Sequence, residues 1–306
     1  MDPAWKKYFD PPTLAELAGL GLRRSQLFDG GPLAGAHRSS RHGHSVEFAE
    51  HRPYVPGDDL RSVDWKIYGR TDRYFLRNRE DETTLVCHLL LDATGSMTFA
   101  GLDAALAGKS SDGENKFDYA ARVAASIGFI TIDAQDQCSL SILGGQGWDL
   151  PVGSGEPQLQ ALAESLSRSA PEGELRIGGL IRQTLPQLER RGVVVVVSDL
   201  LDDVDELDLA VRQVHAAGHD LLLVQVLHPQ ERKLPVRGVT RFEGMEGEPP
   251  IEVQAEAYAD AYQQALQQFD ESVQQLCRDS GTHLLSMTSD QPLGKTLAAG
   301  LHQFYG

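Results

Sequence analysis

The sequence predicts an α/β fold, with a doubly wound, mainly parallel sheet covered by helices on both faces. Near-continuous apolar runs at 85–91, 193–197 and 220–227 are typical of strands buried on both faces. Between them lie segments whose apolar residues recur at helical spacing, most clearly at 116–134. An alternation of strands and helices favours parallel pairing through crossover connections.

The predicted elements after residue 80 follow one another in this alternating order. A strand at 85–91 precedes the helix 116–134, and a strand at 137–143 turns at 144–147 into a short hairpin partner. The remaining helices are expected at 158–168, 180–190 (kinked at Pro186), 207–217, 255–279 and 291–304, and the remaining strands at 193–197, 220–227 and 283–287. Residues 228–254 read as an irregular excursion with two short strands. We expect about six strands, with 85–91, 193–197, 221–227 and 283–287 as neighbours.

An N-terminal loop and β extension is predicted over residues 1–80, ahead of a main domain at 81–306. The extension is expected to hold one helix at 13–27, a loop at 30–44 and short strands at 46–49, 63–68 and 73–77. The second strand would bury Val63, Trp65 and Ile67 on one face. Four histidines between residues 37 and 51 favour a solvated loop, because no cysteine or regular spacing supports zinc.

The two predicted parts also differ in their balance of charged residues. Residues 1–80 contain 13 Lys/Arg and 11 Asp/Glu, whereas residues 81–306 contain 15 and 33. An acidic domain repels phosphate backbones, so nucleic acid is not an expected partner. The longest purely apolar run, Val193 to Val197, is too short to span a membrane, and the first residues do not resemble a secretory signal. Three widely spaced cysteines exclude a disulfide framework, and we expect a cytoplasmic protein.

Oxygen-bearing side chains follow two of the predicted buried strands. Asp92, Thr94 and Ser96 come at the end of the first strand, and Asp199 ends the valine run. The carboxyl ends of parallel strands meet at one sheet edge, and carboxylate and hydroxyl oxygens suit Mg²⁺. The same residues are also typical helix caps. Spacing alone leaves both readings open.

A longer pattern resembles a known bacterial family. Asp-x-Thr-x-Ser followed by an apolar strand and Ser-Asp is similar to the metal-ion-dependent adhesion site of von Willebrand factor A domains. Further segments at 45–48, 52–65, 68–71, 218–220 and 290–293 read SVEF, RPYVPGDDLRSVDW, YGRT, GHD and DQPL. Together they resemble domain-of-unknown-function family 58, whose members resemble von Willebrand A domains, and the likeness covers residues ~45–306.

The resemblance implies a von Willebrand A-type fold and a non-enzymatic adaptor that binds other proteins. It also implies a MoxR-type AAA+ ATPase as partner, with which the chain would assemble or mature a client protein. Asp92, Thr94, Ser96 and Asp199 would hold Mg²⁺, or Mn²⁺ or Ca²⁺. Working sites of this type carry a further Thr, but residues 172–180 contain none, and Leu175 stands in its place. Weak, low-occupancy binding is therefore expected.

An enzymatic alternative is a metal-dependent phosphohydrolase that uses Asp92. Such chemistry needs a second carboxylate two residues later as general acid, and that position holds Thr94. The sequence also lacks Gly-x₄-Gly-Lys-Ser/Thr and Gly-x-Ser-x-Gly, which argues against a P-loop ATPase and a nucleophile elbow. The sequence therefore favours the adaptor.

Overall fold

The protein is described here from a computed structural model. It describes residues 3–18, 48–54, 63, 65–79, 85–102, 115–145, 147–173, 176–188, 190–233, 235–247 and 249–302. The chain divides into two compact units, one formed by residues 1–34 and 85–306 and the other by residues 35–84.

The smaller unit is built on a two-stranded antiparallel ribbon. Strand β1 (Phe48–Pro53) pairs with β2 (Phe75–Arg79), and helix α3 (Trp65–Thr71) lies between them in the chain. Tyr68 stacks on Tyr74 with ring centroids 4.5 Å apart, and the Tyr54 ring lies 6.1 Å from the Tyr74 ring. Such aromatic pairs stabilise a small unit beyond their burial alone.

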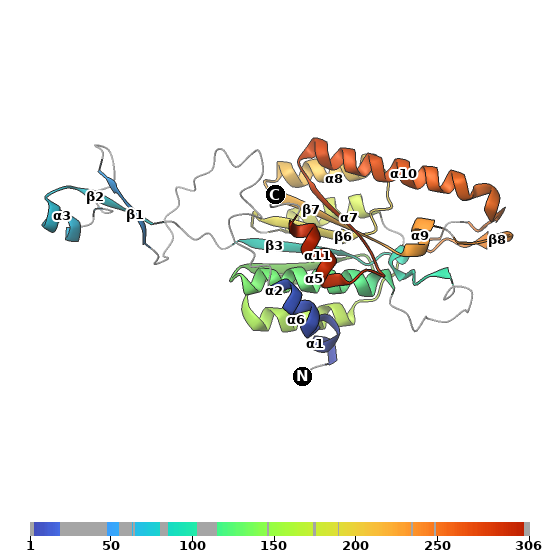
Figure 1. The fold of residues 1–306 in the computed structure, drawn as a ribbon, viewed down its shortest axis with the longest axis horizontal. Coiled ribbons are helices and arrows are strands. Elements are labelled where there is room, and N and C mark those ends of the chain that lie inside the picture. The colour runs from blue at the N-terminus through green and yellow to red at the C-terminus, as the bar shows by residue number, and fades with distance from the viewer. Residues whose placement is uncertain are drawn as a thin grey trace. The chain divides into compact units, whose positions relative to one another are not determined.

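The larger unit contains a six-stranded sheet with the order β10-β7-β6-β3-β4-β5 (Figure 1). Its strands are β3 (Val86–Asp92), β4 (Gln137–Leu143), β5 (Trp148–Gly153), β6 (Val193–Ser198), β7 (Asp220–Leu227) and β10 (His283–Thr288). All neighbours pair in parallel except β4 and β5, which form the antiparallel edge. The α/β class, the mainly parallel sheet and the four predicted neighbours are confirmed.

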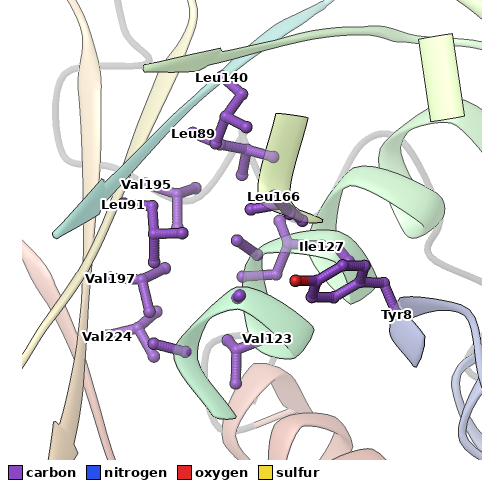
Figure 2. Close-up of a cluster of buried hydrophobic side chains, with 14 of the residues drawn as sticks. Tyr8, Leu89, Leu91, Val123, Ile127, Leu140, Leu166, Val195, Val197 and Val224 are labelled. Atoms are coloured by element: carbon purple, nitrogen blue, oxygen red, sulfur yellow. The ribbon is translucent and has the colours of Figure 1, made fainter. Parts of the chain in front are cut away.

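Helices cover both faces of this sheet (Figure 1). One face carries α5 (Lys116–Asp133), α6 (Gly155–Arg168) and α11 (Leu293–His302), and the other carries α7 (Ile177–Thr184), α8 (Val204–Ala216) and α10 (Ala255–Ser280). Figure 2 shows Leu89, Leu91, Val195 and Val197 of the strands directed toward Ile127 and other helix side chains. Each fully buried aliphatic side chain contributes about 1.5–3 kcal/mol.

Two short helices at the N-terminus belong to the larger unit. Helices α1 (Pro3–Tyr8) and α2 (Pro11–Ala18) pack against α5, α6 and α11. They bury Tyr8, Phe9 and Leu17 in the core on that face of the sheet. The first helix was not predicted, the second begins two residues before the predicted start at 13, and the rest of the predicted helix, 19–27, lies outside the described residues.

The predicted strand at 63–68 is wrong. Residues 65–71 form α3, and Trp65 is 61% exposed, although Val63 is buried. The alternation of Val63, Trp65 and Ile67 is short, and a run this short does not distinguish a strand from one helical turn. The loop predicted at 30–44 lies outside the described residues.

Short elements complete the described chain. After β3 comes the 3₁₀ turn η2 (Gly95–Thr98), and α7 passes into η3 (Leu185–Gln187) at Pro186, where the kink was expected. The excursion after β7 holds α9 (Pro229–Lys233) and an antiparallel hairpin of β8 (Val239–Phe242) and β9 (Ile251–Gln254). Of the described helices, none is long and apolar enough to cross a membrane.

A buried histidine gives the sheet a predictable pH dependence. His88 on β3 lies 2.8 Å from Ser139 Oγ through Nδ1 and 2.8 Å from the Arg190 carbonyl oxygen through Nε2. Burial lowers the pKa of His88, so the unfolded chain binds a proton more readily. The stability from neutral His88 is therefore complete above pH 6.5 and is lost as the pH falls below that value.

His88→Gln should flatten this dependence, because Gln keeps two polar partners without titrating. Thermal unfolding between pH 7.5 and pH 5 should show a smaller loss of Tm in the variant than in the parent. His219, whose ring lies 5.6 Å away and whose pKa burial also lowers, should preserve part of the slope. Parallel curves for parent and variant would contradict this account.

Candidate functional site

The predicted site residues lie where the direction of chain winding reverses. From β3 the chain passes through α5 to β4, whereas from β6 it passes through α8 to β7 on the other side. Ligands of open α/β sheets bind at the carboxyl ends of strands at such a switch point. The register pairs Leu91 with Val197, so the next residues, Asp92 and Ser198, end neighbouring strands side by side.

Asp92 is held by groups from both strands. Ser198 Oγ donates to Asp92 Oδ2 over 2.5 Å, and the Thr94 amide donates to Asp92 Oδ1 over 2.9 Å. The carboxyl is only 2% exposed. Burial and, next, the negative charge of Asp199 raise the pKa of Asp92 to about 7, against the opposing effect of these hydrogen bonds.

Asp199 is bound by a buried ammonium group. Lys116 Nζ lies 2.7 Å from Asp199 Oδ2 and 2.7 Å from Glu231 Oε1. The other oxygen of Asp199 accepts from the Leu201 amide over 3.1 Å. Glu231 in α9 also accepts from the His228 amide over 2.7 Å. One ammonium thus joins the start of α5, the end of β6 and the excursion after β7.

The ammonium of Lys116 stays charged despite its complete burial. Burial lowers its pKa, but the charges of Asp199 and Glu231 together raise it further, so the pKa ends above its ordinary value. A lysine at the first position of a helix also faces the positive end of the helix dipole. The two carboxylates must therefore offset both unfavourable effects.

The turn after β3 is covered by the loop of the β8–β9 hairpin. The Ser96 amide donates to Glu246 Oε1 over 3.1 Å, while Ser96 Oγ and Thr94 Oγ1 lie 3.2 Å apart. A Cβ atom on Gly95 would lie 2.5 Å from the Met245 carbonyl oxygen. Only glycine permits this close approach of the loop to the turn.

The structure brings all four predicted residues to the same sheet edge. Asp92, Asp199 and Thr94 are buried, and Thr94 and Ser96 belong to the turn that follows β3. Sequence reasoning missed Lys116, Glu231 and Glu246. A lysine directly before the apolar helix face was the available signal for the first, whereas the acidic pair sits in an excursion without periodicity. Leu175 lies outside the described residues.

The model of a described family, "Protein of unknown function DUF58", matches residues 50–272. The chain belongs to this family. An uncharacterized protein of Mycobacterium tuberculosis (Rv1480) is 26% identical over 288 residues, which cover 92% of this chain and 86% of the relative. The Mycobacterium bovis protein Mb1516, also uncharacterized, matches with the same identity and the same coverage.

This member of the family has the mainly parallel, six-stranded sheet with helices on both faces that is described above. Solved structures similar to it include an aerotolerance-related membrane protein from Bacteroides fragilis, 15% identical with a TM-score of 0.45, covering 72% of this chain and 98% of that one. BatB from Bacteroides thetaiotaomicron is 14% identical with a TM-score of 0.43 and the same coverage. Likeness at this level carries no information on function.

The described donor set does not fit a resident divalent cation in the unaltered chain. Each of the four carboxylate oxygens of Asp92 and Asp199 already accepts a hydrogen bond from the protein. The Lys116 ammonium lies 2.7 Å from Asp199 Oδ2, so a cation bound to Asp199 would lie beside a positive charge. Among the described residues, no group of three or more His, Cys, Asp or Glu could hold a metal ion. Metal binding by Asp92, Thr94, Ser96 and Asp199 stays a prediction.

Gly95→Ala should detach the hairpin loop from the turn. The added methyl would lie too close to the Met245 carbonyl oxygen, and the backbone must shift at a cost of about 1–3 kcal/mol in unfolding free energy. Gly179→Ala on α7 is the matched control, because a Cβ there meets nothing within 4 Å. Denaturant unfolding should show a loss for the first and no loss for the second. Equal effects would contradict the close approach.

Proposed function

We propose that this chain is a non-enzymatic adaptor that binds other proteins through the hairpin at the switch point of its sheet. The observation that carries the proposal is the internal pairing of the charged groups at this edge. Asp92, Asp199 and Glu231 all have protein donors within hydrogen-bond distance. Such pairing supports a rigid, self-contained edge and leaves no described carboxylate at the edge poised for chemistry.

The adjacent hairpin offers contact surface. Met245 in the loop is 45% exposed, Ile251 on β9 is 57% exposed and Val239 on β8 is 68% exposed. The register pairs Val239 with Gln254 and Phe242 with Ile251, so Val239 and Ile251 lie on opposite faces of the hairpin. The proposed contact is therefore centred on Met245 in the loop. The hairpin is also anchored, since Glu246 accepts from the Ser96 amide. An anchored element loses little conformational freedom when a partner binds.

The proposed partner is a MoxR-type AAA+ ATPase, with which the adaptor would assemble or mature a client protein. This part rests on the family resemblance of the sequence signature. The excess of acidic residues in 81–306 supports a partner with a basic contact surface, because opposite charges speed association. Binding should weaken with rising salt if this charge steering operates.

The phosphohydrolase alternative has less support from the site. A nucleophilic carboxylate must be ionised and reachable, whereas Asp92 is 2% exposed and has a pKa of about 7. Its two oxygens are hydrogen-bonded to Ser198 and Thr94. A hydrolase would have to break these contacts in each cycle.

Met245→Asp should weaken binding of the full chain to the purified ATPase by about ten-fold or more, since it places a charge in an apolar contact. Leu209→Asp on α8 is the matched control, because Leu209 is 46% exposed and lies away from the hairpin in the chain. Surface plasmon resonance of both variants measures the difference.

No binding of the unaltered chain to the ATPase would reject that partner, and equal loss in both variants would reject the hairpin as the contact. A phosphatase assay with p-nitrophenyl phosphate runs beside it. Turnover that disappears in Asp92→Asn would reject the non-enzymatic reading.

A further inference from the structure

Lys116 occupies a position that ordinary helix chemistry disfavours. It is the first residue of α5, follows the N-cap Asn115, and is fully buried. Cations are destabilised at helix N-termini, and buried lysines need partners for their charge. The positive charge of Lys116 must therefore have a role at this position that an apolar side chain could not fill.

The contacts of the Lys116 ammonium resemble those of a bound cation. Its ammonium lies 2.7 Å from a carboxylate oxygen of Asp199 and 2.7 Å from one of Glu231. Asp199 directly follows β6 and Glu231 lies in α9, so the two residues are more than thirty positions apart in sequence. The ammonium thus gathers hard oxygen groups from separate elements, as divalent ions do in proteins.

The remaining carboxylate oxygens of Asp92 and Asp199 also accept hydrogen bonds from the protein. Ser198 Oγ and the Thr94 amide bind the two oxygens of Asp92, and the Leu201 amide binds the second oxygen of Asp199. A divalent ion at Asp199 would also lie beside a fixed positive charge. Because Lys116 and Asp199 are both buried, that repulsion is screened only weakly.

We propose that the Lys116 ammonium is a built-in cation that takes the place of the divalent ion expected for an adhesion site of this type. The unaltered chain then keeps the edge of its sheet assembled without metal. Contacts of partners with this edge use no metal-bridged carboxylate. This inference does not rest on the adaptor role, because it concerns the charge balance of the edge alone.

Removal of the ammonium should turn the same edge into a metal site. Lys116→Ala leaves the carboxylates of Asp199 and Glu231 without a cation and opens the volume of the lysine side chain. Oxygen donors in such a set favour Mg²⁺ or Mn²⁺. A divalent ion, with retained waters, would then restore the lost charge balance.

The test is a Mn²⁺ titration of the full chain, in which electron paramagnetic resonance measures free Mn²⁺. The unaltered chain should show no Mn²⁺ binding up to about 1 mM. Lys116→Ala should bind Mn²⁺ with a dissociation constant at least about ten-fold below that concentration. Lys233→Ala is the matched control, because it removes an exposed lysine two residues from Glu231. It should behave as the unaltered chain. Mn²⁺ should also raise the Tm of Lys116→Ala alone.

Two results would overturn the proposal. One is Mn²⁺ binding by the unaltered chain that disappears in Asp199→Asn, since the site would then hold metal beside the lysine. The other is a folded Lys116→Ala that binds Mn²⁺ no better than Lys233→Ala. If Lys116→Ala does not fold, the comparison of the unaltered chain with Asp199→Asn still decides the first point.

Discussion

The ion cluster of Lys116, Asp199 and Glu231 connects three parts of the larger unit that are distant from one another in sequence. Lys116 is the first residue of α5, Asp199 follows β6, and Glu231 lies in α9. Removing one partner from a buried cluster of this kind costs about 3–5 kcal/mol, because a charge is left without compensation. That cost ties the position of α9, and of the hairpin after it, to the sheet edge.

The same cluster gives the switch point its character. A crevice at the carboxyl ends of β3 and β6 is the place where α/β sheets bind ligands. In this protein the polar groups there are hydrogen-bonded to one another. Ser198 and Thr94 donate to Asp92, and Glu246 accepts from the Ser96 amide. This internal pairing fixes the turn on which the exposed hairpin rests, which links the adaptor proposal with the built-in cation.

The sheet could be predicted from the sequence because its strands are buried on both faces. The runs 85–91 and 193–197 contain no polar residue except His88, and they predicted neighbouring parallel strands correctly. Segment 63–68 failed because three alternating apolar residues fit a strand and a helical turn equally. Asp92 and Asp199 were predictable from strand ends, whereas Glu231 and Glu246 were not, because they lie outside the sheet. Lys116 was not, because its partners Asp199 and Glu231 are distant in sequence and only the tertiary fold brings them together.

The most direct measurement is a crystal structure of the full chain grown with Mn²⁺, with anomalous diffraction recorded at the manganese absorption edge. The account predicts no anomalous peak between Asp92 and Asp199, and electron density for Lys116 Nζ within hydrogen-bond distance of Asp199 and Glu231. An anomalous peak bound by Asp92, Thr94, Ser96 or Asp199, with the lysine displaced, would contradict it.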